Sequence, residues 1–149
     1  MPKPRTKQMA AWRAFLEAHA ALSRVLEDEL QAAHELPLAW YDVLVQLSEA
    51  PGGSLRMQQL ADSVLLSKSG LTRLFDRMEA ARFVRRKPCD DDGRGTLAVI
   101  TPSGRAVLKR AAPVHLSGIE RHFARHLSDG NAAVLAASFA RMRDALNPE

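Results

Sequence analysis

Apolar residues in the first 50 positions recur at spacings of three and four, which is the period of one face of a helix. The pattern predicts a first helix over residues 8–33 and a second over residues 38–50, with Pro37 ending the first segment. The broad apolar face of the second helix is typical of a buried scaffold helix. A Pro-Gly-Gly sequence at residues 51–53 then predicts a turn.

The middle of the chain predicts two short helices, over residues 57–64 and 68–81. The segment at 54–57 is too short to assign, and an edge strand is one option for it. In the second of the short helices, the large apolar side chains fall within about 100° of arc. They are Leu71, Leu74, Phe75 and Met78. The opposite side is polar, and its residues are Ser69, Thr72, Arg73, Asp76 and Arg77.

The pattern changes from helix to strand after residue 82. Residues 83–88 and 96–101 predict two strands, and the polar, glycine-containing residues 89–95 predict the tip of a hairpin. Two short helices joined by a tight turn and followed by a hairpin form a winged helix-turn-helix pattern. Thr101 then fits the N-cap and Pro102 the first position of a further helix.

That helix is expected to run to about residue 127, where Ser-Asp-Gly-Asn breaks it, and a last helix covers about 131–146. The predicted fold class is therefore mainly α with a small β-hairpin. A length of 149 residues favours a single domain. Within it, residues 38–101 form the winged helix-turn-helix. Residues 8–33 and 102–147 carry apolar stripes that a winged domain alone would not cover, so we expect them to be dimerisation helices.

A single cysteine, Cys89, excludes an intrachain disulfide and fits a reducing cytosol. The basic N-terminal segment lacks the apolar stretch of a signal peptide, and no apolar run approaches the ~18 residues of a membrane span. We therefore expect a cytoplasmic protein with no membrane partner. No defensible catalytic triad or dyad and no phosphate-binding loop is present, so we expect no enzyme activity, no cofactor and no bound metal.

The formal charge of +4 is unevenly distributed along the chain. Residues 68–110 hold eleven Lys and Arg against five Asp and Glu, whereas residues 1–67 hold six against eight and the remainder is balanced. The basic middle is where a polyanion such as DNA would bind. A merely solvated basic face is the alternative that charge alone leaves open.

The helix over residues 68–81 combines three features suited to DNA. Its polar side begins with small residues that allow close approach, and its N-terminus presents free N–H groups that suit phosphate. Thr72 and Arg73 lie in the first turns, where recognition helices make base contacts. Arginine pairs bidentately with guanine, and the threonine methyl group contacts that of thymine. On the hairpin, Arg94 between two glycines is placed to enter a minor groove.

Three motifs resemble the MarR family of bacterial transcription regulators. They are LPLAWYDVLVQL (scaffold helix), MQQLADSVLLSKSGLTRLFDRMEAARFVRR (helix-turn-helix) and DDGRGTLAVITPSGRAVL (wing and next helix). The resemblance covers nearly the whole chain. It implies a homodimer on a pseudo-palindromic double-stranded DNA operator, acting as a repressor. It also implies release by a small, often phenolic, anion.

The resemblance assigns DNA-facing roles to individual residues. These are Ser67, Ser69, Thr72 and Arg73 on the recognition helix and Arg94 on the wing, with Asp92 bracing the wing. From the residues themselves we add Lys68 and Arg77 on the helix, Arg86 and Lys87 on the wing, and Asp76 as a bracing residue. Bracing of Asp76 and Arg77 against each other is the alternative for those two. Two departures stand out. Gly93 replaces a usual arginine, which implies a looser wing or one phosphate contact fewer. Arg82 stands where a helix-ending glycine is usual, so either it adopts a positive φ or the helix ends differently.

Other residue groups leave alternatives open. An aromatic acid would suit a cavity bordered by Trp12, His19, Trp40 and Tyr41, although aromatic residues at helical spacing also serve cores. His122 and His126 have a zinc-ligand spacing on one helix, and Cys89 begins the wing. A metal- or redox-responsive member of the same family is therefore an alternative. So is a winged protein-interaction module without DNA binding.

Overall fold

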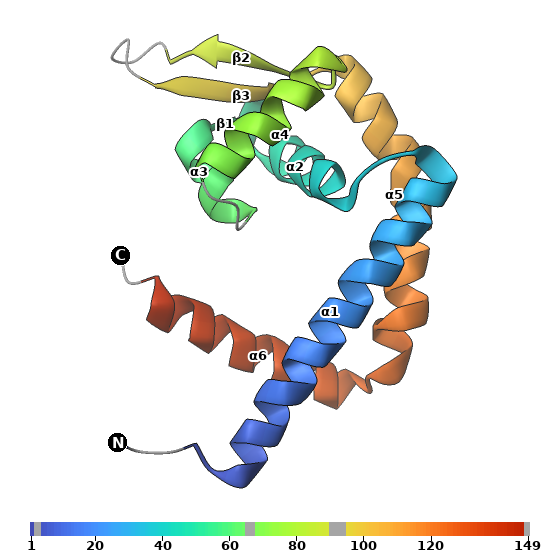
Figure 1. The fold of residues 1–149 in the computed structure, drawn as a ribbon, viewed down its shortest axis with the longest axis vertical. Coiled ribbons are helices and arrows are strands. Elements are labelled where there is room, and N and C mark those ends of the chain that lie inside the picture. Colours follow the sequence, from blue (N-terminus) through green and yellow to red (C-terminus); the bar gives the residue numbers. More distant parts are fainter. Residues whose placement is uncertain (2–3, 65–67, 90–94, 148–149) are drawn as a thin grey trace. The chain divides into compact units, whose positions relative to one another are not determined.

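The computed structural model describes residues 1, 4–64, 68–89 and 95–147. The chain divides into two compact units: a central unit, Glu27–His115, and a terminal unit made of Met1–Leu26 and Leu116–Glu149. Helices α1 (Thr6–His34) and α5 (Pro102–His122) each contribute residues to both units. Most of the described chain is helical, with one small sheet, which confirms the predicted fold class (Figure 1).

The remaining helices lie close to their predicted positions. They are α2 (Leu38–Glu49), α3 (Met57–Ser63), α4 (Lys68–Ala80) and α6 (Asp129–Leu146), with two 3₁₀ turns, η1 (Pro51–Gly53) and η2 (Ala124–His126). No helix in the part of the chain that the structure describes is long and apolar enough to cross a lipid bilayer.

The sheet has three antiparallel strands in the order β1-β3-β2. Strands β2 (Val84–Pro88) and β3 (Thr96–Ile100) pair with Val84 opposite Ile100, so the predicted hairpin is confirmed. Each strand is one residue shorter than predicted. Strand β1 (Ser54–Arg56) pairs with the other edge of β3, so the edge strand that the sequence left as an option does form.

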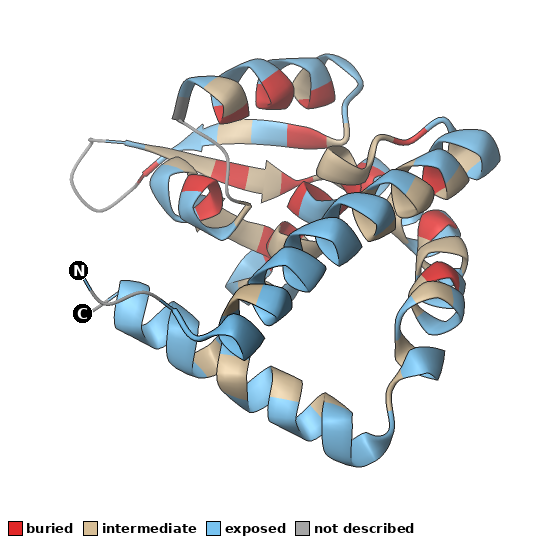
Figure 2. Cartoon of the chain, turned by 60° about the horizontal axis from the view of Figure 1, so that its bottom comes forward, coloured by how far each residue is buried: buried red, intermediate tan, exposed pale blue. Residues whose placement is uncertain are grey.

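The larger of two buried clusters in the central unit lies between α2, α3, α4 and the sheet (Figure 2). Its buried members are Val43, Leu44, Leu47, Leu60, Ala61, Leu71, Leu74, Phe75, Met78, Val84, Ala98 and Ile100. All four apolar residues expected on one side of α4 are among them, so that prediction is confirmed. Burial of each of these side chains stabilises the folded state by roughly 1.5–3 kcal/mol, so the apolar side of α4 is held against the core.

The N-terminus of α2 is capped from α1. Its N-cap residue, Pro37, makes no side-chain cap hydrogen bond. Instead the backbone N–H of Leu38 donates to Oε2 of Glu27 at 2.6 Å. A carboxylate at this position satisfies a free N–H group and complements the positive end of the helix dipole. Glu27 therefore joins the end of α1 to the start of the scaffold helix.

The C-terminus of α4 is closed by Arg82, whose φ is 65°. The N–H of Phe83 donates to the carbonyl of Met78 at 3.1 Å, and the N–H of Arg82 donates to that of Glu79 at 2.9 Å. These two bonds form a Schellman motif, in which glycine is usual at the position of positive φ. Of the two outcomes expected for Arg82, the positive φ is the one observed.

Thr101 caps α5, as predicted. Its Oγ1 accepts a hydrogen bond from the N–H of Gly104 at 3.0 Å, and Pro102 is the first helical residue. The same hydroxyl donates to the carbonyl of Arg82 at 2.6 Å. One side chain therefore satisfies groups at the start of α5 and at the end of α4.

The prediction that this helix continues to about residue 127 is wrong. α5 stops at His122, because Phe123 leaves helical geometry with φ −127° and ψ −64°, and η2 follows. α6 begins at Asp129, two residues earlier than predicted, because Oγ of Ser128 accepts from the N–H of Asn131 at 3.2 Å. The residues expected only to break a helix therefore also start the next one.

The described residues of the terminal unit form no apolar core of their own. No apolar side chain is buried among its described residues. It holds the large exposed apolar residues of the described chain: Met1, Trp12, Phe15, Leu16, Leu116, Phe123, Val134, Phe139, Met142 and Leu146. The rings of Phe15 on α1 and Phe139 on α6 lie 5.5 Å apart. Despite this contact, both rings remain exposed, and so do other large apolar side chains of the two helices.

Candidate nucleic-acid interface

Polar side chains cover the outer face of α4, opposite the buried Leu71, Phe75 and Met78. The exposed members are Ser69, Thr72, Arg73, Asp76 and Arg77. Lys68 is the first residue of the helix, and Ser67 lies outside the described residues. Because the apolar side is buried in the central core, the polar side has one fixed orientation within this unit.

Arg73 and Arg77 are four residues apart and therefore lie one turn from each other on the same face of α4. Thr72 adjoins them. A guanidinium group can donate two parallel hydrogen bonds to a guanine edge, and a threonine offers both a hydroxyl and a methyl group. The exposed face of α4 thus presents the groups needed to distinguish base edges in a major groove.

The hairpin adds positive charge beside α4. Arg85 and Lys87 are exposed on β2. Alternate residues of a strand point to opposite sides, so these two share one side and Arg86 lies on the other. Asp92, expected to brace the wing, and Arg94, expected to enter a minor groove, lie outside the described residues, as does Gly93.

Arg86 is bound to α4. Its Nη2 donates to Oδ1 of Asp76 at 2.6 Å and its Nη1 to Oε1 of Glu79 at 2.7 Å. The backbone N–H of Arg86 also donates to Oε2 of Glu79, at 2.9 Å. The guanidinium carbon lies 5.0 Å from the ring centroid of Phe75. The residue expected to contact DNA is thus engaged within the protein, and Asp76, expected to brace the wing, is one of its partners.

Glu79 is a residue of this interface that sequence reasoning missed. Asp76 and Glu79 are three residues apart, so they lie on the same side of α4. An arginine on the adjoining strand is the expected partner for two such carboxylates. The spacing of the two carboxylates therefore indicates a shared basic partner. The sequence alone does not say which of the three consecutive basic residues on β2 faces the helix.

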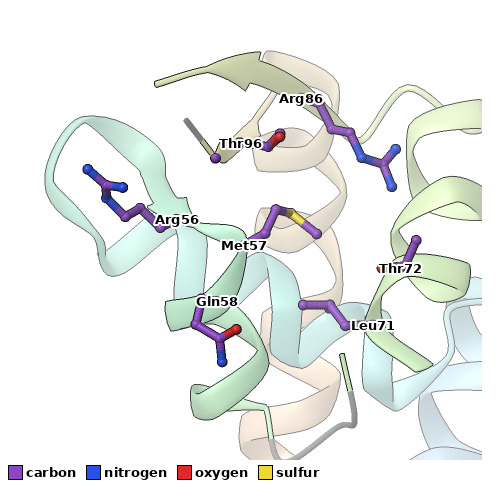
Figure 3. A pocket seen from close by; sticks show the side chains of 8 residues that line it. Arg56, Met57, Gln58, Leu71, Thr72, Arg86 and Thr96 are labelled. Atoms are coloured by element: carbon purple, nitrogen blue, oxygen red, sulfur yellow. The ribbon is translucent and has the colours of Figure 1, made fainter. Parts of the chain in front are cut away.

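A hollow of about 350 Å³ opens between α3, α4 and the sheet (Figure 3). Thr72 and Leu71 line it from α4, and Met57 and Gln58 line it from α3. Arg86 reaches it from β2. Its volume is at the small end of the roughly 300–1,000 Å³ of ligand pockets. Thr72 therefore borders both this hollow and the outer face of α4.

Two of the residues expected to border a ligand cavity belong to the terminal unit. Trp12 and His19 lie on either side of Phe15 along α1, with ring centroids 6.0 Å and 6.2 Å from that of Phe15. Both are exposed, as is Phe15. They form an open aromatic row on one helix.

The other two expected cavity residues pack in the central unit. Trp40 meets Phe83 edge-on at 6.0 Å, and Tyr41 is buried against His115 with ring centroids 4.4 Å apart. Burial raises the pKa of the Tyr41 hydroxyl, and two nearby carboxylates raise it further. Trp40 and Tyr41 therefore contribute to packing, which was the alternative role that their helical spacing allowed.

His122 and His126 do not share one continuous helix face, because α5 ends at His122 and His126 lies in η2. Both line a hollow of about 510 Å³ within the terminal unit, with Leu22 and Val25 of α1. Across residues 1, 4–64, 68–89 and 95–147, no group of three His, Cys, Asp or Glu side chains is placed to hold a metal ion. A zinc site therefore has no support from this geometry.

Cys89 directly follows β2, at the tip end of the hairpin, as a free thiol with 5% of its surface exposed. Its backbone N–H donates to the carbonyl of Gly95 at 3.4 Å. Redox-sensing cysteines are accessible and lie close to positive groups that favour the thiolate. The burial of Cys89 is typical of a structural cysteine.

Known proteins resemble this chain in both sequence and structure. A family model described as the MarR family matches residues 34–95. An HTH-type transcriptional regulator of Bacillus cereus is 30% identical over 95 residues, which is 64% of this chain, and the match spans only 61% of that protein's length.

Two solved structures match along the whole chain. AbsC of Streptomyces coelicolor, a MarR family transcriptional regulator, is 34% identical, with a TM-score of 0.90 and complete coverage of both chains. Sco3205 of the same organism, a MarR family regulator crystallised in complex with DNA, is 31% identical, with a TM-score of 0.91. That match covers all of this chain and 94% of Sco3205.

Proposed function

Because the chain belongs to the MarR family of DNA-binding transcription regulators, which are not enzymes, we propose that it is a homodimeric repressor whose helix α4 reads its operator. The observation that carries this proposal is the exposed face of α4, with Thr72 and Arg73 held in place by the buried residues behind them. The structure of the similar Sco3205 protein in complex with DNA supports DNA as the partner of this chain.

In this proposal different residues of α4 contact different parts of the DNA. Thr72 and Arg73 contact base edges in the major groove. Ser67, Lys68 and Ser69 approach the sugar-phosphate backbone near the N-terminus of the helix, where the positive end of the helix dipole attracts phosphate. Arg77, one turn beyond Arg73, extends the positive face. On the wing, Lys87 adds backbone charge and Arg94 enters the minor groove, with Asp92 bracing it.

A second copy of the chain is the proposed cover for the terminal unit. A body whose described residues include no buried apolar side chain cannot offset the entropy of ordering its helices alone. Contiguous exposed apolar residues on α1 and α6 mark a protein–protein contact rather than a solvated surface. A two-fold dimer presents two α4 helices and therefore requires a pseudo-palindromic operator, with half-sites roughly 34–36 Å apart.

Sedimentation equilibrium tests the dimer. Met142 on α6 is 56% exposed, and Met142→Glu would place a charge in the proposed interface. We expect wild type to sediment as a dimer and this variant to dissociate. Ala133→Glu is the matched control, because Ala133 is exposed on the same helix about 180° away at 100° per residue. A monomeric wild type, or equal dissociation of both variants, would contradict the proposed interface.

Release by a small aromatic acid completes the proposal. The exposed row of Trp12, Phe15 and His19 on α1 offers flat aromatic surface for such a ligand. A thermal-shift screen of benzoate-type acids tests it, because a ligand that binds only the folded protein raises Tm. We expect at least one acid to raise Tm and also to weaken DNA binding. Acids that leave both Tm and DNA binding unchanged would remove this part of the proposal.

DNA binding itself is tested by fluorescence anisotropy on the DNA upstream of the protein's own gene. We expect the wild type to prefer this DNA to a random duplex of equal length. Affinity should fall steeply as salt concentration rises, because phosphate contacts release counterions. Equal affinity for both duplexes at every salt concentration would contradict the proposed function.

A further inference from the structure

Arg86 is attached to α4 at three points, although it belongs to strand β2. Its guanidinium group binds Asp76 and Glu79, and its backbone N–H binds Glu79 as well. Only 28% of the Arg86 side chain is exposed, against 60% for Asp76 and 39% for Glu79. The face of the Phe75 ring, itself fully buried in the core, lies against the guanidinium group. The arginine is therefore the inner member of the cluster.

This cluster is poorly suited to bind a phosphate. It sets one positive group against two carboxylates, so its formal charge is negative. Two of the guanidinium N–H groups already donate to carboxylate oxygens at 2.6 and 2.7 Å, the short distances of charge-assisted hydrogen bonds. Moving Arg86 to a phosphate would leave Asp76 and Glu79 facing each other without a cation. An arginine that only supplies charge to DNA would not need such partners.

The cluster is well placed to fix the recognition helix relative to the wing. The turn at Arg82 joins α4 to β2 at one end. Glu79 lies near that turn, whereas Asp76 lies almost one helical turn further along α4. Arg86 therefore holds β2 to the helix at a second, separate level. Figure 3 shows its side chain reaching from the strand toward α4 on the side of Thr72.

We propose that Arg86 is a positioning residue, which with Glu79 and Asp76 sets the orientation of α4 against the wing, and that it does not contact DNA. The inference rests on the proposed function, because it assumes that α4 reads the operator. Base contacts need groups held within about 0.5 Å of the productive geometry. Loss of the cluster should therefore reduce discrimination between sequences rather than remove one phosphate contact.

The test is a double-mutant cycle with Arg86→Met, Glu79→Gln and the double variant. Each protein is measured on the operator and on random DNA over a range of salt concentrations, with urea unfolding to verify folding. We expect Arg86→Met to lower the ratio of operator to random affinity about tenfold, the order of coupling for residues in contact. The double variant should be no worse than Arg86→Met alone, and the salt slope should stay at the wild-type value.

Two further variants sharpen the result. Arg85→Met removes the same charge from the neighbouring position on β2, and we expect it to leave the ratio unchanged. Arg86→Lys keeps the charge but cannot reproduce the planar two-carboxylate geometry, so it should rescue only in part. Because Glu79→Gln preserves shape, it still reports on the cluster if Arg86→Met fails to fold.

Three outcomes would overturn the inference. A salt slope that falls by about one in Arg86→Met, with equal weakening on both DNAs, would identify a phosphate contact. Additive effects in the cycle would show that Arg86 does not act through Glu79. An equal loss in Arg85→Met would assign the effect to net charge. A wild type with no operator preference would instead overturn the proposed function itself, and this inference with it.

Discussion

The hydroxyl of Thr101 and the backbone carbonyl of Arg82 form a 2.6 Å hydrogen bond that joins the start of α5 to the end of α4. The backbone N–H of Thr101 also donates to the carbonyl of Phe83, at 3.1 Å. Helix α4, strand β2 and helix α5 therefore meet at one short segment of backbone. Substitutions at this junction should change stability in ways that the geometry defines.

Thr101→Val should destabilise the protein by about 1–2 kcal/mol, because it removes both the cap of α5 and the bond to Arg82. Valine keeps the shape of threonine, so packing is little altered. Urea unfolding measures the loss. Thr101→Ser is the control, since its hydroxyl can make both bonds, and it should remain near wild type. A Thr101→Val protein as stable as wild type, with a loss only in Thr101→Ser, would show that the methyl group, not the hydroxyl, matters here.

Gly104→Ala should be strongly destabilising, because a Cβ there would lie 2.1 Å from the carbonyl oxygen of Phe83. Overlap with backbone cannot be relieved by a rotamer change, and overpacking of this kind typically costs 1–3 kcal/mol or more. Gly130, in the first turn of α6, has open space around it. Gly130→Ala should therefore stabilise by roughly 0.5–1 kcal/mol. Thermal unfolding should show a lower Tm for Gly104→Ala and a higher Tm for Gly130→Ala. A Gly104→Ala protein with the wild-type Tm would contradict the close approach of the Phe83 carbonyl to Gly104.

Arg82→Gly should raise the free energy of unfolding by up to about 1 kcal/mol. Relief of the left-handed conformation is worth roughly 1–2 kcal/mol, and the greater freedom of glycine in the unfolded chain offsets part of it. Arg82→Ala removes the same charge and keeps the positive φ, so it should give no gain. Chemical unfolding measures the free energy of unfolding of both variants. If Arg82→Ala is stabilised as much as Arg82→Gly, the effect comes from the lost charge and not from the backbone.

His115 should make the protein sensitive to acid. Burial lowers the pKa of His115 below its ordinary value, and the Glu29 carboxylate opposes this only in part. The unfolded chain therefore binds a proton at a higher pH than the folded chain does. This contribution to stability is present above the unfolded pKa of about 6.5 and is lost as pH falls through it toward the folded value.

Urea midpoints at pH 7.5 and pH 5.5 measure this effect. Wild type should lose more stability between the two values than His115→Gln does. The glutamine variant also loses the ring contact with Tyr41, but that loss is the same at both pH values and cancels in the difference. The same acid-induced loss in both proteins would show that other groups account for it.

Local chemistry made several elements predictable. The two-sided pattern of α4, the strand pattern of the hairpin and the Thr101–Pro102 cap each depend on neighbouring residues, and all three are observed. β1 was only an option, because a three-residue strand has too few positions to show a period and is stabilised by its pairing with β3.

Features set by tertiary contacts were not predictable from single residues. The partner of Arg86 depends on which side of β2 faces α4, which the run of three basic residues does not reveal. The end of α5 at His122 has no Gly or Pro signal, so the helical pattern was extended too far. Trp40 and Tyr41 suit either a cavity or a core from sequence alone, and only the fold shows that they pack against Phe83 and His115.

If the outer face of α4 reads DNA sequence, as proposed, replacing Arg73 must reduce the ratio of operator affinity to random-DNA affinity. The measurement compares operator and random duplex for wild type, Arg73→Ala and Arg110→Ala, which removes the same charge from α5. We predict that Arg73→Ala lowers this affinity ratio roughly 5- to 150-fold, which corresponds to about 1–3 kcal/mol of binding free energy. Arg110→Ala should leave the ratio unchanged. An Arg73→Ala protein that keeps the wild-type ratio would show that this face of α4 does not read sequence.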